Sequence, residues 1–224
     1  MGFKTYSKFW NEKLAKLIRK NFSCSDLIYS ANTISHIKDI SRTLNAINLV
    51  LSNDGILILE DPSLLECLKM NAYDQFYCEH IYVFSLLSIM KLIEKFHLEV
   101  FHVEKTKTHG GSNRYYIKRI ANKKFMINKS VKKMIREETK FGLNKFSTYL
   151  QFANRVKMSK KKLLEILKRC KYKKLKVIGY GATAKSSTVL NFCNIKQDLV
   201  SYFLDTTPDK HNKYIPGVHI PINK

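Results

Sequence analysis

The chain has 224 residues, of which 45% are hydrophobic and 12% aromatic, so a packed core is expected and wholesale disorder is not. No apolar run approaches the roughly 18 residues of a membrane span, and the first residues lack the apolar segment of a secretory signal. The five scattered cysteines predict neither a disulfide framework nor a zinc cluster, and the formal net charge is +22, so we expect a cytoplasmic protein without a metal site.

The first half of the chain alternates amphipathic helices with short apolar strands. Helices are predicted at 6–20, 37–51 and 84–96, and strands at 26–31, 56–60, 98–103 and 114–120. Asn53-Asp54-Gly55 is a turn signal before the second strand. This alternation predicts an α/β fold with parallel strands. The last two strands, joined by a short glycine turn, are expected to pair antiparallel at the sheet edge.

The second half begins with a long helical pattern from about 128 to 171, with an interruption predicted near Gly142. A strand at 175–181, a helix at 183–193 and a strand at 200–205 then predict a second βαβ unit.

Residues 118–176 carry 21 of the 40 lysines and arginines but only three acidic residues. Such a block could attract nucleic acid, an anionic surface or a phosphorylated substrate. The pattern favours a lysine-rich, solvated helix face, because Leu, Ile and Phe recur within it at helical spacing. Both interpretations stay open at this point.

Tyr77-Cys78-Glu79-His80 is the first candidate site. Histidine suits proton abstraction near neutral pH, an adjacent glutamate can orient it, and a tyrosine can donate to a developing oxyanion. The alternative is an exposed polar loop.

Two further polar segments adjoin predicted strands. Ala31, Asn32 and His36 follow the first strand, where ligands of open parallel sheets bind, although Asn32 could simply cap the next helix. Ser112 and Arg114 follow two glycines and could meet an anion, or could belong to a plain hairpin turn.

The fourth candidate is the segment 179–185, which lies between a predicted strand and helix. Amide groups after its glycine turn at Gly181 favour phosphate, and Lys185 would add a positive charge. The segment is neither a GxGxxG fingerprint nor a P-loop, so an ATPase is not predicted.

Taken together, these segments resemble the C-methyltransferases that act on nucleotide-linked keto-deoxysugars. The resemblance is carried, in order along the chain, by residues 26–37, 77–80 with 84–85, 109–114, 179–185, 190–191 and 213–221. It covers most of the chain.

The resemblance implies three parts. Residues 1–121 would be a partial S-adenosylmethionine (SAM)-dependent methyltransferase domain, holding the last four strands of a seven-stranded sheet. Residues 122–173 would be a helical connector, and 174–224 a partial Rossmann-like domain. The family's N-terminal zinc module and its glycine-rich SAM loop are expected to be missing, so SAM binding by this chain alone is doubtful.

The resemblance also implies residue roles. His80 would remove a proton from the carbon next to a ketone, with Glu79 beside it, and Tyr77 and His36 would bind the sugar or stabilise the enolate. Ala31 and Asn32 would adjoin the cofactor. Substrate contacts would come from Ser112, Arg114, Gly181, Lys185 and Asn191. Cys78 departs from the polar residue expected at its place.

The resulting hypothesis is a SAM-dependent C-methyltransferase fragment that is inactive alone, acting on a nucleotide-linked deoxysugar. A separate chain could supply the missing N-terminal part. No membrane partner is expected. The alternative is a basic module that binds nucleic acid or an anionic surface without catalysis. It is disfavoured, because aromatic residues do not interleave with the lysines as a base-stacking platform requires.

Overall fold

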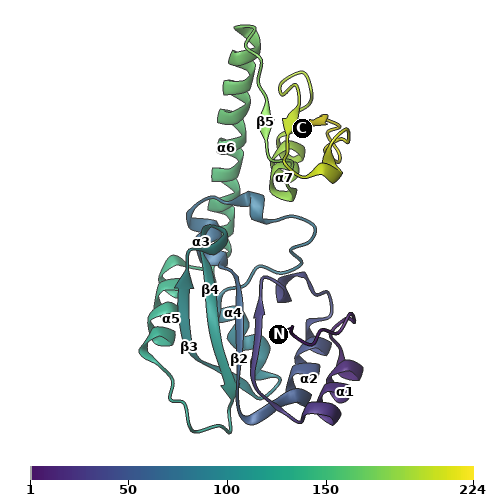
Figure 1. The fold of residues 1–224 in the computed structure, drawn as a ribbon. Helices are drawn as coiled ribbons and strands as arrows, with labels where there is room; N and C mark the ends of the chain where they lie inside the picture. Colours follow the sequence, from purple (N-terminus) through teal and green to yellow (C-terminus); the bar gives the residue numbers. More distant parts are fainter. Residues whose placement is uncertain (1) are drawn as a thin grey trace. The chain divides into compact units, whose positions relative to one another are not determined.

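The structure, a computed structural model, describes residues 2–224 and divides into two compact units, each built from separate stretches of the chain (Figure 1). The first unit holds the chain up to Glu66 together with Ile81–Asn144, and the second holds Cys67–His80 together with Lys145–Lys224. The boundaries of these units differ from those of the three predicted domains, 1–121, 122–173 and 174–224. The division into three domains stays a prediction. The difference arises because residues 67–80 pack on helices of the second unit.

The first unit contains a four-stranded sheet in the order β1-β2-β4-β3. Its strands are β1 (Ser25–Ala31), β2 (Leu51–Pro62), β3 (Leu98–Thr106) and β4 (Ser112–Arg119). Strands β1 and β2 run parallel, whereas β4 is antiparallel to both β2 and β3. The predicted α/β fold and the antiparallel pairing of the last two strands are confirmed. Strand β3 forms the edge, and β4 lies inside the sheet.

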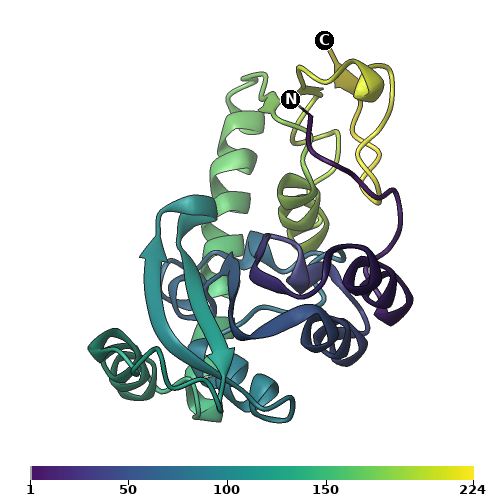
Figure 2. The ribbon, with the colours of Figure 1, turned by 60° about the horizontal axis from the view of Figure 1, so that its bottom comes forward.

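Four longer helices accompany this sheet: α1 (Glu12–Phe22), α2 (Ile40–Val50), α4 (Leu86–Glu94) and α5 (Lys129–Phe141). Figure 2 shows α1 and α2 side by side, where Ala15, Ala46 and Val50 form a small buried cluster. The larger core joins apolar residues of α2, α4, α5 and the strands, including Leu44, Ile89 and Ile117. The apolar stripes predicted for the second and third helices therefore face this core. The first helix begins at Glu12, later than the predicted residue 6, because Asn11 accepts a hydrogen bond from the amide of Leu14 and caps it.

The predicted turn at Asn53-Asp54-Gly55 lies within β2 and not before it. Ser25 pairs with Leu51, and Leu27 pairs with Ile56, so the residues between Leu51 and Ile56 bulge out of the ladder. A Cβ atom at Gly55 would lie 2.8 Å from Leu51 Cδ1 and 2.9 Å from the Ser25 carbonyl oxygen, so the bulge has no room for a side chain there. The turn signal thus marks an irregularity in a longer strand.

Helix α4 begins against a buried carboxylate from α5. The Glu138 side chain accepts hydrogen bonds from the amides of Leu86 at 2.8 Å and Leu87 at 2.9 Å. These amides belong to the first turn of α4, which has no intrahelical partners for them. Burial raises the pKa of Glu138, and the two amide bonds offset that effect only in part. Glu138 therefore fixes α5 to the amino-terminal end of α4.

The long helical pattern divides at Gly142, as predicted. Gly142 follows α5 with φ 88° and ψ 33°, and its amide donates to the carbonyls of Glu138 and Thr139. Helix α6 (Phe146–Tyr172) follows and belongs to the second unit. The left-handed conformation of Gly142 ends α5 in the way that C-terminal glycines commonly do.

The second unit carries a small parallel sheet in the order β5-β6-β7. Its elements are β5 (Gly179–Tyr180), α7 (Ala184–Cys193), β6 (Phe203–Leu204) and β7 (Ile222–Asn223). The predicted βαβ order is confirmed, although β5 and β6 are shorter than predicted. Leu167 of α6, Leu190 of α7, Phe203 and Ile220 share its core.

The segment 67–80 packs on α6 and α7. It includes the end of α3 (Leu64–Lys69) and the short η2 helix (Tyr73–Gln75). The ring centroid of Tyr73 lies 5.4 Å from that of Phe192, and the ring centroid of Phe76 lies 5.9 Å from that of Phe152. The guanidinium group of Arg155 donates to the Leu68 carbonyl at 2.8 Å. Aromatic packing therefore assigns this segment to the second unit.

Across residues 2–224, no helix combines the length and the apolar character needed to cross a membrane.

We expect Gly142→Ala to lower the free energy of unfolding by about 1 kcal/mol, since a Cβ atom disfavours the left-handed conformation by about that amount. Urea denaturation measures the change. Gly2→Ala is the control, because a Cβ atom at Gly2 would meet nothing within 4 Å. Equal stability of the Gly142 variant and the wild type would contradict the expectation.

Candidate functional site

Tyr77 and His80 lie in contact in the loop after η2. The phenol oxygen of Tyr77 lies 2.9 Å from His80 Nε2, and the two ring centroids are 4.1 Å apart. On the other side of the imidazole, His80 Nδ1 lies 2.8 Å from the Gln75 carbonyl oxygen. The backbone amide of His80 donates to the Tyr77 carbonyl at 2.9 Å and closes the turn. The imidazole is thus held from both of its nitrogens.

These contacts assign the tautomer of a neutral His80. A carbonyl oxygen only accepts hydrogen bonds, so Nδ1 must carry the proton that it shares with Gln75. Nε2 then has the lone pair, and the Tyr77 hydroxyl donates to it. The nitrogen that can take up a proton is therefore Nε2, and its lone pair is directed at a phenol.

Tyr77 remains a phenol at neutral pH. Burial raises its pKa above the ordinary value of 10.0, and the charges of Glu79 and Cys78 raise it further. A neutral phenol beside an imidazole can donate a hydrogen bond, and it can donate to a substrate oxygen if it leaves Nε2. The pair therefore contains one acceptor and one donor within hydrogen-bond distance.

A pocket of about 630 Å³ opens next to this loop, wholly within the second unit. One wall includes Tyr77 and Glu79 of the loop, and another includes Thr183 and Asn191 at α7. The rest of the lining includes Lys210, Lys213 and Tyr214 from the loop before β7. The pocket thus brings together three residues predicted from the sequence, Tyr77, Glu79 and Asn191.

The glycine turn before α7 is closed by internal hydrogen bonds. Gly181 has φ +85°, and its amide donates to the Leu204 carbonyl at 2.7 Å. Thr183 and Ser186 form a capping box, in which each side chain accepts from the backbone amide of the other residue. Lys185 lies on α7 but is not among the residues that line the pocket.

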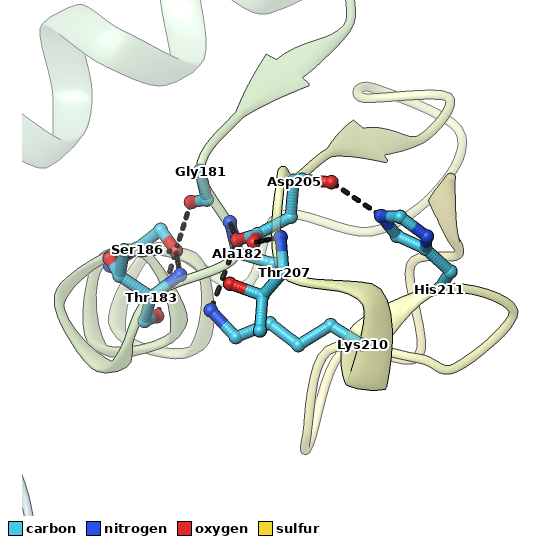
Figure 3. A network of polar contacts seen from close by, with 8 residues as sticks. All are labelled: Gly181, Ala182, Thr183, Ser186, Asp205, Thr207, Lys210 and His211. Carbon is cyan, nitrogen blue, oxygen red and sulfur yellow. Dashed lines mark hydrogen bonds and ion pairs between the residues drawn. The ribbon is translucent and has the colours of Figure 1, made fainter. Parts of the chain in front are cut away.

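Asp205, at the end of β6, connects this turn to the loop opposite (Figure 3). Its Oδ2 accepts from the Ala182 amide at 2.8 Å and from Lys210 Nζ at 3.1 Å. Its Oδ1 accepts from the Thr207 amide at 2.8 Å. His211 Nε2 lies 2.7 Å from the Asp205 carbonyl, so this nitrogen is the donor. The hydrogen bonds from Thr207, followed by that from Lys210, hold the pKa of Asp205 well below its ordinary value.

Ala31, Asn32 and His36 occupy the carboxyl end of β1 in the first unit. Asn32 has a left-handed φ of 49°, and its amide donates to the Glu60 carbonyl at 2.7 Å. Its side-chain oxygen is buried and has no hydrogen-bond partner among the described residues. His36 closes the short η1 helix (Ile34–His36) and is half-buried. The predicted cofactor residues therefore include an unused hydrogen-bond acceptor.

Asp61 follows Glu60, whose carbonyl accepts the hydrogen bond from the Asn32 amide. Asp61 pairs with Asn113 of β4, and both side chains are 1% exposed. Neither carboxylate oxygen of Asp61 has a partner in hydrogen-bond geometry among residues 2–224. Burial raises its pKa to about 6, and nearby Ser35 and His36 offset that effect only in part. Asp61 is thus a buried carboxyl group that titrates close to neutral pH.

Ser112 and Arg114, both predicted to bind substrate, make internal contacts. The buried Ser112 hydroxyl donates to the Thr108 carbonyl at 3.0 Å. Arg114 forms an ion pair of 2.7 Å with the buried carboxylate of Glu60 and a longer one of 3.7 Å with Glu104. Their predicted contact with an anion stays a prediction; Ser112 closes the turn between β3 and β4, and Arg114 links β4 to β2 and β3.

Sequence reasoning missed Lys210, Lys213, Asp61 and Asp205. Lys213 begins the segment 213–221 and Lys210 stands three residues before it, but neither was separated from the general lysine excess. Asp205 carried a signal, because an acidic residue ends the second strand of the unit about where a Rossmann-like fold places one. Asp61 carried none. Within residues 2–224, no three His, Cys, Asp or Glu side chains are grouped to hold a metal ion.

Comparisons with known proteins match both halves of the chain. The sequence model of a family described as the C-methyltransferase C-terminal domain matches residues 107–224, and one described as a methyltransferase domain matches residues 10–103. A protein of Streptomyces niveus named C-methyltransferase NovU is 31% identical over 221 residues, which are 99% of this chain and 52% of that protein. The chain therefore spans about half the length of this curated relative.

Two solved structures are also similar. A SAM-dependent methyltransferase of Anabaena variabilis is 13% identical with a TM-score of 0.37, over 49% of this chain and 55% of that one. The magnesium protoporphyrin IX methyltransferase of Synechocystis, solved with bound SAH, is 15% identical with a TM-score of 0.34, over 43% of this chain and 45% of that one.

We expect Asp61→Asn to become increasingly stabilised relative to the wild type as the pH rises from 4 to 7.5. The pKa of about 6 in the folded state exceeds the ordinary value of 3.8, so folding favours the protonated acid. This contribution is complete below the unfolded pKa and is lost as the pH rises through 6. The difference in free energy of unfolding should change by up to about 3 kcal/mol.

Urea denaturation at both pH values measures that change. Exposed Asp209→Asn is the matched control and should leave the wild-type pH dependence in place. A stability difference between Asp61→Asn and wild type that is the same at both pH values would show that the buried carboxyl does not titrate in this range.

Proposed function

We infer that this chain, which belongs to the family of the C-methyltransferase C-terminal domain, acts in the SAM-dependent transfer of a methyl group to carbon. We propose that the acceptor carbon is next to the ketone of a nucleotide-linked deoxysugar. The observation that carries the proposal is the Tyr77–His80–Gln75 arrangement beside a pocket of about 630 Å³. C-methylation next to a ketone requires a base, and this arrangement supports one.

His80 is the proposed base. The Gln75 carbonyl holds the Nδ1 proton, which leaves the Nε2 lone pair as the proton acceptor. When His80 takes up a proton at Nε2, the positive charge is shared with Nδ1, whose N–H remains hydrogen-bonded to a carbonyl dipole. The Gln75 carbonyl therefore supports both the neutral and the protonated forms without a change of geometry.

Tyr77 is proposed to act as donor to the enolate oxygen. Its hydroxyl currently donates to Nε2 at 2.9 Å, so the carbon-bound proton must take its place there. A displaced phenol has a proton to donate, because its raised pKa keeps it neutral. The substrate would thus replace the Tyr77–His80 hydrogen bond with one contact to Tyr77 and one to His80. Substrate binding would thereby make the lone pair of the base available.

Roles in substrate binding are also proposed for three other residues. Glu79 lines the pocket next to Tyr77 and could contact a sugar hydroxyl or the charged imidazole. His36, at the carboxyl end of β1, is proposed to bind the sugar or the enolate. Asn191, in the α7 wall, is proposed as a substrate contact, although its amide group donates to Ser187 and Pro216 carbonyls.

SAM supplies the methyl group when it is bound. The residues proposed to adjoin it are Ala31 and Asn32, and the buried, unpartnered side-chain oxygen of Asn32 fits a ligand that donates hydrogen bonds. Asp61, whose neighbour Glu60 accepts from the Asn32 amide, adds two buried oxygens without a hydrogen-bond partner among the described residues. These residues fit the donor groups of the cofactor at this end of the sheet.

We expect His80→Ala to lower proton abstraction from a nucleotide-linked keto-deoxysugar by about 100-fold or more, the usual contribution of a general base. Exchange of the carbon-bound hydrogen with deuterated solvent measures this step without SAM. In a form reconstituted with the segment that binds SAM, SAM affinity, measured by calorimetry, should be nearly unchanged. His219→Asn is the control, because His219 is exposed and lies outside the Tyr77–His80–Gln75 arrangement. Exchange at the wild-type rate in His80→Ala would remove His80 from the role of base.

We expect Tyr77→Phe to slow the same exchange by roughly 10- to 100-fold, since one donor to a developing oxyanion is lost while the ring packing on His80 is kept. The loss should appear in kcat more than in KM, because the contact forms as charge develops. An unchanged kcat would show that another group meets the enolate oxygen.

A further inference from the structure

We propose that Asp205 is a positioning residue that occupies the glycine turn before α7 and directs the diphosphate of the substrate to Lys210 and Lys213. The inference rests on the proposed function, because it concerns the diphosphate of a nucleotide-linked sugar. It reverses the expectation from the sequence, in which the turn at Gly181 and Lys185 on α7 would hold the phosphate.

Four donors of the glycine turn and capping box before α7 are already used. The Gly181 amide donates to the Leu204 carbonyl at 2.7 Å, and the Ala182 amide donates to Asp205 at 2.8 Å. The Thr183 amide donates to Ser186 Oγ at 2.9 Å, and the Ser186 amide donates to Thr183 Oγ1 at 3.2 Å. A phosphate in the glycine turn would therefore have to displace existing partners.

One of those partners is an anion. The Asp205 carboxylate is 7% exposed and is held by two backbone amides and one lysine (Figure 3). Since these bonds keep it ionised, the helix end already has its complementary negative charge. A second anion in the glycine turn would meet repulsion from this carboxylate, and the amides of Gly181 and Ala182 already have acceptors. The glycine turn is thus occupied by the protein itself.

Lys210 is held at the pocket by the same carboxylate. Its Nζ lies 3.1 Å from Asp205 Oδ2, and its side chain remains 37% exposed. An ammonium group has three donors, so one bond to Asp205 leaves two for a ligand. Lys213, which is exposed, lines the same pocket from the same loop. Their position predicts an anion site on this wall of the pocket.

The charges of the pocket favour one orientation of the ligand. Lys210 and Lys213 come from the loop before β7, whereas Glu79 and Tyr77 come from the loop after η2. A nucleotide-linked sugar has its charge on the diphosphate and its reactive ketone on the sugar. The diphosphate therefore belongs with the lysines, and the sugar belongs with Tyr77 and Glu79.

Inorganic pyrophosphate is the probe for this site, titrated by calorimetry at low salt into the full chain. Lys210→Met and Lys213→Met should each weaken binding about tenfold, as expected for a lost charge-assisted contact. Lys185→Met should leave the affinity within twofold of wild type, as should the control, Lys168→Met on the exposed part of α6. Loss of affinity in Lys185→Met but not in the two pocket variants would overturn the proposal.

Asp205→Asn tests the positioning role through a double-mutant cycle. If Asp205 acts through Lys210, the tenfold effect of Lys210→Met should shrink to less than about twofold in the Asp205→Asn background. Backbone amide spectra give a second readout. Pyrophosphate should shift Lys210 and Lys213 signals in wild type, and should shift the Ala182 signal only in Asp205→Asn. Additive effects, or a shifted Ala182 signal in wild type, would refute the role.

These results separate the inference from the proposed function. Pyrophosphate binding needs neither SAM nor proton abstraction. If deuterium exchange depends on His80 but pyrophosphate binding is unchanged in both pocket lysine variants, the proposed function is supported and the anion site is refuted. If pyrophosphate binding depends on the two lysines but deuterium exchange does not depend on His80, the anion site is supported and the proposed role of His80 in methyl transfer is refuted.

Discussion

The packing of residues 67–80 on α6 and α7 is the constraint on which the candidate site depends. Two aromatic pairs, Tyr73 with Phe192 and Phe76 with Phe152, join the segment to helices more than 70 residues later in the chain. The Tyr77–His80 turn follows directly, so its imidazole is held by a loop whose own position is fixed by these ring contacts. A base on an unsupported loop would lose the defined Nε2 direction that proton abstraction requires.

This packing also explains why the pocket lies within one compact unit. The loop supplies Tyr77 and Glu79, and the Rossmann-like part supplies α7 and the lysine loop. Asp205 ties the last two together, since it bonds Ala182 before α7, Thr207 after β6 and Lys210 at the pocket. One buried carboxylate thus orders two of the pocket walls.

Two buried aspartates have opposite surroundings. Asp205 is held by two backbone amides and a lysine, which keep it ionised and make it a structural anchor. Burial raises the pKa of Asp61 to about 6, because nearby Ser35 and His36 offset the cost of burial only in part. The same residue type therefore anchors a turn in one place and is a buried group of raised pKa in the other.

The sequence by itself determined the α/β class, the antiparallel end of the first sheet, the break at Gly142 and the βαβ order near the C-terminus. These features depend on local periodicity, turn residues and left-handed glycine, which neighbouring residues encode. It also pointed to Tyr77, Glu79 and His80, because their chemistry is recognisable in four consecutive letters. Only the tertiary structure decided which nitrogen of a neutral His80 has the lone pair, and that residues 67–80 join the second unit. It alone revealed that Asp205 fills the turn expected to bind phosphate. Those outcomes depend on contacts between residues far apart in the chain, and no local pattern records such contacts.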